Sequence, residues 1–573
     1  LYASSQRIWK TTNAGQTWEA ISGDLTRHDP KTMQDSGGPI THDMNSPEIY
    51  ATVFSLGPGK TDANILWAGS DDGIVQVTRD GGKTWTNVTP PGMPEFGRVS
   101  QIDASAFDAG TAYVAVKKPL LGDFSPYIFR TRDYGRTWTK IVTGIAANDF
   151  THVVREDPAR RGMLYAGTHH GLYFSYDDGD HWQSLRLNLP DTPISDIWVE
   201  ANDITIATHG RGFYILDSIG PLRQWGQPVV TATDAYLFKP GDLIRGSGGA
   251  TISYWLKKPA QNLKLEILDG SGQVIRSIDG AMPKENAPKP SVPGTSGPTV
   301  APAVPGTNPT PAVPGPGSAA SAPGTSPAGA VPGTQQAGEE QPQEDEEDFP
   351  RRGPQTASMA AGLQRFTWDV RHEPVVSFPG MVLWGATTNG PMALAGSYQA
   401  RLTVDGKPQT ASFELKKDPW RGVSDADLHE QFELASRIRD KVNEANNAII
   451  QIRKIKQQLD DRTKQTSNAD VKAIAEQFSK ELTTVEESVY QVKNRSNQDP
   501  LNFPIKTNNR LASLLRVVEA GDGKPIGNVQ PIFNDLQGEL KTETDRLQRT
   551  IATYLQRFNQ AAQRAGMQPI TEK

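Results

Sequence analysis

An eight-residue phrase built around a glycine and a tryptophan occurs four times in the first 190 residues. The copies are TTNAGQTW (11–18), TRDGGKTW (78–85), TRDYGRTW (131–138) and SYDDGDHW (175–182). Each has Ser or Thr first, Asp or Asn third, Gly fifth and Trp eighth, and each lies between two short strand-like runs. Repetition of this kind predicts one structural unit used several times rather than one reaction centre.

The residue types of the phrase suit a hairpin turn. The Asp or Asn oxygen and the Ser or Thr hydroxyl accept hydrogen bonds from nearby backbone N–H groups. Glycine supplies a positive φ at little steric cost, and tryptophan buries a large ring beside the turn. We therefore assign structural roles to Asn13, Gly15, Trp18, Asp80, Gly82, Trp85, Asp133, Gly135, Trp138, Asp177, Gly179 and Trp182.

The phrase resembles the Asp-box, or bacterial neuraminidase (BNR) repeat, of β-propellers. The longer stretches ILWAGSDDGIVQVTRDGGKTW, VVREDPARRGMLYAGTHHGLYFSYDDG and IATHGRGFYILD resemble large secreted bacterial proteins with sortilin-like propellers, often labelled glycosyl-hydrolase-like. GSYQARLTVDGK and NRSNQDPLNFPIKTNNRL extend the resemblance to nearly the whole chain. It implies that each box joins the third and fourth strands of a blade, away from the active-site mouth.

The spacing of the boxes predicts blades of unequal length. Consecutive box tryptophans lie 67, 53 and 44 residues apart (18 to 85, 85 to 138, 138 to 182), enough for one four-stranded blade each. A fifth unit at 203–217 repeats the strand pattern without a box. Five units with an incomplete first one predict an unclosed propeller over residues 1–225. The resemblance implies a C-terminal portion, so we expect upstream blades on an N-terminal fragment or another chain.

The middle of the chain changes in composition. Residues 283–350 hold 16 of the 43 prolines and end in a strongly acidic run, so 283–353 is predicted to be a disordered Pro/Gly-rich acidic linker. On both sides of it, 230–282 and 354–418 alternate apolar and polar residues between turns, which predicts a β-sandwich. GSYQARLTVDGK resembles immunoglobulin-like modules, which implies that subclass.

The last region, 419–573, has a helical period. Apolar residues step by threes and fours after Ser424, and helices are predicted at about 424–460, 469–494, 506–520 and 528–565. This predicts an α-helical bundle or long hairpin. A second interpretation is an oligomer contact through these helices.

The candidate catalytic residues are few. Glycoside hydrolysis normally needs two carboxylates about 5–10 Å apart. The polar insertion at 24–48 offers Asp43 and Glu48 as weak candidates, whereas Asp71 and Asp72 in GSDDG are expected to form a turn. No motif for a metal, phosphate or activated nucleophile is found, so no cofactor and no metal are expected.

The candidate ligand-binding residues are histidines at equivalent positions of consecutive repeats. His169 and His170 in GTHHGLY and His209 in THGRG are expected to approach each other near the propeller axis. Arg211 is a further candidate for lining the central channel. The alternative for all four is packing and hydrogen bonding within the repeat.

Charge and composition narrow the function classes. A net charge of −6 argues against a nucleic-acid-binding surface, and the absence of cysteine excludes disulfides and thiolate chemistry. No apolar run is long enough to span a membrane, and the start LYASSQRIWK, without Met, indicates a processed or excerpted chain. We expect a secreted, periplasmic or cell-surface protein that binds a glycan or peptide or takes part in assembly, without catalysis. The alternative is a sialidase- or xyloglucanase-like glycoside hydrolase acting on extracellular glycans.

Overall fold

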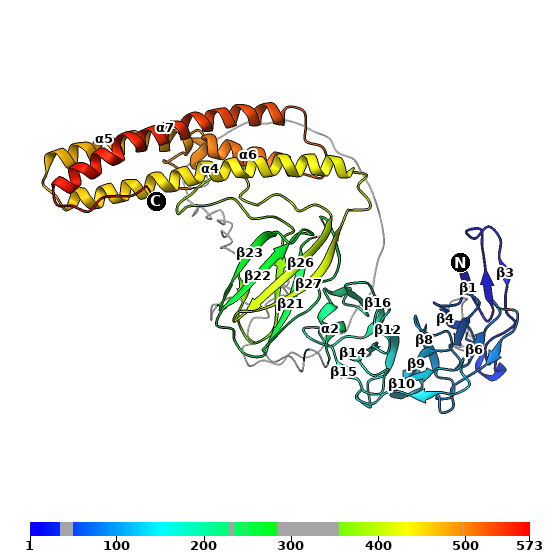
Figure 1. Cartoon of the computed structure of the whole chain (residues 1–573). Helices are drawn as coiled ribbons and strands as arrows, with labels where there is room; N and C mark the ends of the chain where they lie inside the picture. The colour runs from blue at the N-terminus through cyan, green and yellow to red at the C-terminus, as the bar shows by residue number, and fades with distance from the viewer. Residues whose placement is uncertain are drawn as a thin grey trace, which may run out of the picture. The chain divides into compact units, whose positions relative to one another are not determined.

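The structure is a computed structural model that describes residues 1–34, 50–226, 229, 234–246, 248–283, 355–496 and 498–572. Residues 1–281 and 357–573 are grouped in one unit, whose helices and strands are labelled in Figure 1. The predicted linker at 283–353 lies outside the described residues except for Pro283.

The first 216 residues form five consecutive antiparallel sheets, numbered here sheet 1 to sheet 5. Sheet 1 contains β1 (Tyr2–Ser4), β2 (Ile8–Lys10) and β3 (Glu19–Ala20), and sheet 2 contains β4 (Val53–Pro58), β5 (Leu66–Ser70), β6 (Val75–Thr78) and β7 (Thr86–Asn87). Sheet 3 contains β8 (Arg98–Ala104), β9 (Ala112–Lys118), β10 (Asp123–Thr131) and β11 (Thr139–Lys140). Sheet 4 contains β12 (Thr151–Glu156), β13 (Leu164–Thr168), β14 (Leu172–Ser175) and β15 (Gln183–Ser184), and sheet 5 contains β16 (Ile194–Val199), β17 (Ile204–Thr208) and β18 (Phe213–Leu216). Short 3₁₀ turns lie at η1 (Pro30–Thr32) and η3 (Pro119–Leu121).

Each sheet packs on the next through its own apolar cluster. Ile8 of sheet 1 meets Val53 of sheet 2, and Val77 of sheet 2 shares a cluster with Val114 of sheet 3. Equivalent clusters join sheet 3 to sheet 4 and sheet 4 to sheet 5. Consecutive up-and-down sheets stacked in this way have the arrangement of propeller blades.

The repeated phrase forms the turn between the last two strands of sheets 1 to 4, which are the third and fourth strands in sheets 2 to 4. In the second copy, Asp80 Oδ1 accepts from the Thr84 N–H at 2.9 Å and Oδ2 accepts from the Thr84 hydroxyl at 2.6 Å. Thr78 Oγ1 accepts from the Gly82 N–H at 3.0 Å and donates to Asp80 at 2.8 Å. The bonds from Thr84 lower the pKa of Asp80 to about 2, so the turn is held by an ionised carboxylate.

The box tryptophans of sheets 2 to 4 bind the preceding sheet. Each Nε1 donates to the carbonyl of the residue that directly follows the last strand of that sheet. The bonds run from Trp85 to Ile21 at 3.0 Å, from Trp138 to Val88 at 2.8 Å and from Trp182 to Ile141 at 2.9 Å. Trp18 of sheet 1 has no such partner among the described residues and is 43% exposed, whereas Trp182 is 4% exposed. The prediction that every box tryptophan is buried therefore fails at Trp18, because no described sheet covers it.

The box glycines make the same contact possible. Gly82 has a φ of +102°, and a Cβ there would lie 2.7 Å from the Ile21 carbonyl oxygen. Gly15 has a similar φ of +90°, but a Cβ there would meet nothing nearer than its own Trp18 ring at 3.8 Å. Glycine thus supplies the positive φ of the turn in all four boxes. In the boxes that follow a described sheet, it also leaves room for the contact between the two sheets.

Residues 235–283 and 355–416 form two sheets that share one core. One has the order β19 (Ala235–Leu237), β21 (Ala250–Leu256), β25 (Gly362–Trp368). The other has the order β20 (Leu243–Ile244), β27 (Lys407–Lys416), β26 (Gly396–Val404), β22 (Leu263–Leu268), β23 (Val274–Ala281), β24 (Ala357–Ser358). Buried residues of both sheets, such as Trp368 and Phe413, belong to one cluster, so the region is a two-layer sandwich. Its immunoglobulin-like subclass stays a prediction.

The C-terminal helices are α4 (Asp425–Lys464), α5 (Ala469–Val489), α6 (Thr507–Val518) and α7 (Val529–Arg564), with a 3₁₀ turn η4 (Asp499–Leu501). A short helix, α2 (Gly220–Gln224), precedes the sandwich. Ser424 caps α4 by accepting from the Asp427 N–H at 3.1 Å. No helix in the described part of the chain is long and apolar enough to cross a membrane.

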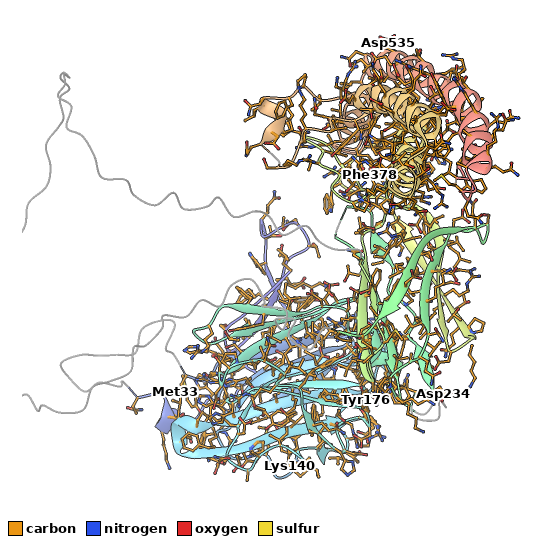
Figure 2. All side chains as sticks on the ribbon, turned by 90° about the vertical axis from the view of Figure 1, so that its left-hand side faces the viewer. Met33, Lys140, Tyr176, Asp234, Phe378 and Asp535 are labelled. Carbon is orange, nitrogen blue, oxygen red and sulfur yellow. The ribbon has the colours of Figure 1, made fainter. Side chains whose placement is uncertain are left out.

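A segment inside the predicted sandwich range packs on these helices instead. Phe378, labelled in Figure 2, belongs to the helical core, and its ring meets the Tyr490 ring edge-on at 5.0 Å. Tyr490 has extended backbone and its hydroxyl donates to the Gly380 carbonyl at 3.1 Å. Helix α5 therefore ends at Val489 rather than at the predicted residue 494, because Tyr490 leaves the helix to hold this segment.

The two glycines of the first two boxes provide a matched test of the contact between sheets. Gly15→Ala is expected to cost about 1–2 kcal/mol from the left-handed backbone alone. Gly82→Ala adds a clash with the neighbouring backbone, worth about 1–3 kcal/mol more. Urea unfolding followed by tryptophan fluorescence measures both variants. Equal urea midpoints for Gly15→Ala and Gly82→Ala would contradict the close contact between Gly82 and the preceding sheet.

Candidate ligand-binding pocket

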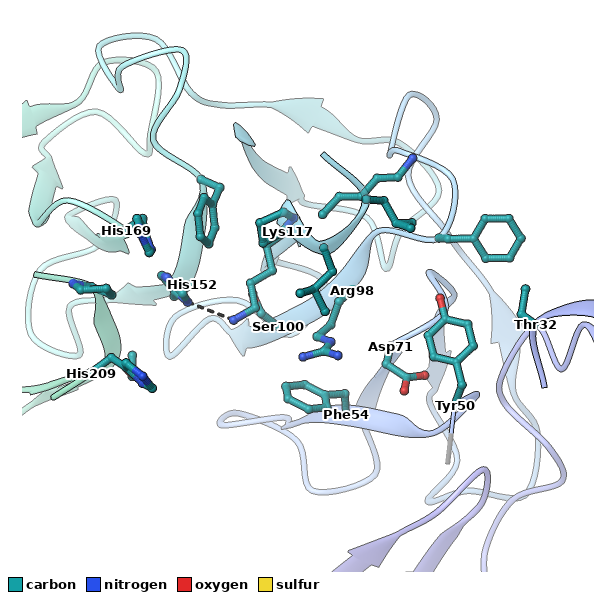
Figure 3. Close-up of a pocket in the computed structure, with 18 residues that line it drawn as sticks. Thr32, Tyr50, Phe54, Asp71, Arg98, Ser100, Lys117, His152, His169 and His209 are labelled. Carbon is teal, nitrogen blue, oxygen red and sulfur yellow. Dashed lines mark hydrogen bonds between the residues drawn. The ribbon is translucent and has the colours of Figure 1, made fainter. Parts of the chain in front are cut away.

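A pocket of about 850 Å³ is lined by residues of sheets 2 to 5 and their loops (Figure 3). Eighteen side chains line it, and eight of them come from only two structural positions repeated in four sheets. The repeated sheets therefore build the pocket from the same two structural positions.

The first position is a bulge in the first strand of each sheet. In β12, Thr151 pairs with Thr168 and Val153 with Gly167, which leaves His152 as the extra residue. A bulge of this kind re-aims a side chain out of the ladder. The corresponding extra residues of the other three sheets are Phe54, Ser100 and Ser195. All four side chains line the pocket.

The second position lies at the end of the second strand. His169 follows β13, and its backbone N–H donates to the Phe150 carbonyl at 3.0 Å. His209 follows β17 and donates to the Pro193 carbonyl at 2.9 Å. Asp71 and Lys117 occupy the corresponding positions of sheets 2 and 3, and all four line the pocket.

Basic side chains meet where sheets 3 and 4 adjoin. Lys117 Nζ lies 3.0 Å from His152 Nδ1, the dashed contact in Figure 3. The His152 and His169 rings are roughly parallel, with centroids 5.9 Å apart. The Arg98 guanidinium lies over the Phe54 ring at 4.9 Å. Neither Arg98 nor Lys117 forms an ion pair with a described residue, and His152 Nε2 and His169 Nδ1 are buried without a hydrogen-bond partner there.

Burial shapes the protonation of this cluster. It lowers the pKa of His152 to about 3, with the charge of Lys117 acting in the same direction. It lowers the pKa of Lys117 to about 8, and the neighbouring charge of Arg98 contributes. The pKa of His169 is also lowered, first by burial. Burial raises the pKa of Asp71, against the hydrogen bonds from Thr52 that lower it.

The rest of the lining is largely apolar. Phe54, Phe96 and Phe150 contribute rings, and Leu120 and Leu121 on η3 are 84% and 62% exposed. Pockets that bind small ligands combine apolar walls with a few convergent polar groups. This pocket has that composition, with an excess of positive groups.

The predicted candidates separate into three groups. His169 and His209 line the pocket. His170 does not, because its ring lies 2.9 Å from an Asp191 oxygen. Arg211 is exposed and outside the lining, and its backbone N–H donates to Thr208 Oγ1 at 3.2 Å. Asp43 and Glu48 lie outside the described residues.

The lining residues that were not predicted as ligand-binding include Arg98, Lys117, His152 and Asp71. Asp71 was assigned to a turn, and it does accept from the Thr52 N–H at 2.8 Å, but it also lines the pocket. An alignment of the repeats at the ends of their second strands would have shown that Lys117 holds the same position in sheet 3 as His169 holds in sheet 4. Nothing in the sequence marks the bulge that selects His152. No group of three acidic, His or Cys side chains suited to a metal ion is found in the described ranges.

No protein-family model matches the chain, and no curated protein matches it. Similar solved structures include a GH74 enzyme of Niastella koreensis, at 15% identity and a TM-score of 0.25 over 38% of this chain and 30% of that one. The GH74 xyloglucanase from Xanthomonas campestris is similar at 16% identity and a TM-score of 0.25, over 35% of this chain and 34% of that one. YCF48 bound to D1 peptide is similar at 15% identity and a TM-score of 0.21, over 37% of this chain and 77% of that one. The chain spans about a third of the length of the GH74 structures, and likeness at this level establishes neither a family nor a function.

The protonation of His152 can be measured directly. The unfolded chain binds a proton on this ring below its ordinary pKa of 6.5, whereas the folded protein does so only near 3. The stability that neutral His152 contributes is therefore present above about pH 6.5 and is lost as the pH falls towards 3. Carbon-13 NMR of the histidine rings at pH 5 should show neutral rings for His152 and for His372, whose pKa burial lowers to about 4, and His152→Gln should remove the first of these signals and leave the second. Titration of this ring near pH 6.5 would contradict the burial described.

Proposed function

We propose that residues 1–216 are part of a β-propeller that binds a ligand in the pocket without hydrolysing it. The observation that supports this most is the pair Arg98 and Lys117, two cations in a largely apolar pocket that form no ion pair with a described residue. Only one described carboxylate of the lining, Asp71, partly offsets their charge, through its interaction with Arg98. An unpaired charge in partly dehydrated surroundings is costly, and an anionic ligand offsets that cost. Ordinary packing of the repeat does not account for it.

The ligand that fits this lining is a glycan or peptide with a negative group beside an apolar surface. The negative group faces Arg98 and Lys117, and the apolar part faces Phe54 and Phe150.

Glycoside hydrolysis is the less favoured alternative. Among the described lining residues the only carboxylate is Asp71, which is held by Thr52, whereas hydrolysis normally needs two. The predicted candidates Asp43 and Glu48 remain predictions. The same binding experiment, with released sugar as a second readout, decides between the two.

Binding is tested with an array of acidic and neutral oligosaccharides and peptides. We expect acidic members to bind and no product to be released. Lys117→Gln should weaken binding at least about tenfold, the loss expected for one charged hydrogen bond of about 1.5 kcal/mol. Lys83→Gln, on an exposed box residue, is the matched control and should bind normally. Preferential binding of neutral members, or release of reducing sugar, would refute the proposal.

A second candidate function is assembly with further blades, favoured by the exposed end faces. In sheet 4, Leu172 and Phe174 are buried beneath sheet 5. Phe213 and Ile215 hold the same ladder positions in sheet 5, yet are 79% and 61% exposed. Trp18 is exposed at the opposite face of sheet 1. We infer that sheets 1 and 5 bind blades supplied by an N-terminal fragment or another chain.

Photo-cross-linking tests the assembly. A benzophenone amino acid at position 215 in the full-length protein should cross-link to a segment carrying a box-type turn, identified by mass spectrometry. The same probe at position 124, an exposed phenylalanine on β10, is the control. A cross-link from position 215 into the C-terminal helices, or none at all, would argue against blade docking.

Other parts of the proposal rest on the sequence. We propose a secreted, periplasmic or cell-surface location and an immunoglobulin-like sandwich. An oligomer contact through the C-terminal helices is also proposed, and exposed apolar side chains there include Val517, Ile526 and Ile532.

A further inference from the structure

We propose that Lys117 is a reactive amine that condenses with the carbonyl group of an aldehyde bound in the pocket. Binding alone needs no such chemistry, so this inference goes beyond the proposed function. It stands on the position of the amine, on its neighbours and on the space before it.

Lys117 lies at a strand end, where its side chain lines the pocket of about 850 Å³. Its amine is oriented by His152, whose Nδ1 is 3.0 Å away. Apolar rings of Phe54 and Phe150 line the same space, so an apolar aldehyde has a surface to contact. In Figure 3 the amine is drawn beside the His152 ring within this lining.

The groups around the amine disfavour its protonation. Arg98 is its cross-strand partner, and its charge repels an ammonium. The remaining titratable lining groups are His152, His169, His209, Lys118, Asp71 and Tyr50. Burial is the larger cause and the charge of Arg98 the smaller one, and together they lower the pKa of Lys117 to about 8. A lysine that is desolvated or lies next to another cation is the usual form of a nucleophilic amine.

His152 has a second property that suits this reaction. Its lowered pKa keeps the ring neutral at physiological pH, so it carries one proton. When Lys117 donates to Nδ1, that proton lies on Nε2, which is buried and has no described partner. Nδ1 thus serves as the hydrogen-bond acceptor that orients the amine, while Nε2–H lies buried on the opposite side of the ring.

The condensation balances without any redox partner. The lone pair of the neutral amine attacks the carbonyl carbon and forms a C–N bond, while the C=O π electrons move to oxygen, which takes up a proton. The nitrogen gives up its protons, the C–O bond breaks and the oxygen leaves as water. One amine and one aldehyde give one imine and one water.

Reductive alkylation of the full chain tests the proposal. The probe is 3-phenylpropanal with cyanoborohydride at pH 7.5, and tryptic peptides are quantified by mass spectrometry over time. A pKa lowered by about 2.5 units raises the neutral fraction roughly 300-fold, and the accompanying fall in nucleophilicity leaves a net gain of at least about tenfold. Lys117 should therefore be labelled at least about tenfold faster than the exposed lysines of the same molecule, which are internal controls.

Two variants and a pH series sharpen the result. Lys117→Gln should remove the fast site, whereas Lys83→Gln, at an exposed box residue outside the lining, should leave it. The labelling rate of Lys117 should level off above about pH 8, while other lysines continue to accelerate. Labelling of Lys117 at or below the rate of exposed lysines overturns this inference. It leaves the ligand-binding proposal standing, because the array contains no aldehyde.

Discussion

The five-sheet part of the chain depends on one contact, which is repeated where sheets 2, 3 and 4 each meet the sheet before them. A box tryptophan donates to the carbonyl of the residue just past the last strand of the preceding sheet, and the box glycine leaves room for that same residue. Apolar clusters supply most of the burial, but they are not directional. The tryptophan bond is directional, so it sets the position at which one sheet meets the next.

Much of the fold could be predicted because its signals are local. The turn chemistry of the box located β6 and β7, and the apolar period after Ser424 located α4. The errors lie where distant contacts override local preference. Tyr490 continues a helical pattern, yet it leaves the helix because Phe378 and Gly380, more than a hundred residues earlier, bind its ring and hydroxyl.

The pocket could be predicted only in part, for a similar reason. His169 and His209 were recognisable because they stand at matching points of two similar phrases. Lys117 stands at the same point of a sheet whose phrase differs, and His152 is selected by a bulge that no residue type announces. The sequence also could not predict that His170 stays outside the pocket lining, because its ring position depends on a contact with Asp191, twenty-one residues later.

The bulged residues carry a consequence for how such a protein changes over time. Each bulged residue has no partner in the pairing of its strand with the next strand. Its side chain therefore does not follow the alternation between core and surface that fixes its neighbours. The four sheets hold phenylalanine, serine, histidine and serine there without loss of the common scaffold. A single substitution at one of these points alters the chemistry of the pocket while the hydrogen-bonded framework is retained. The fold therefore separates the part that must be conserved from the part that can diversify towards new ligands.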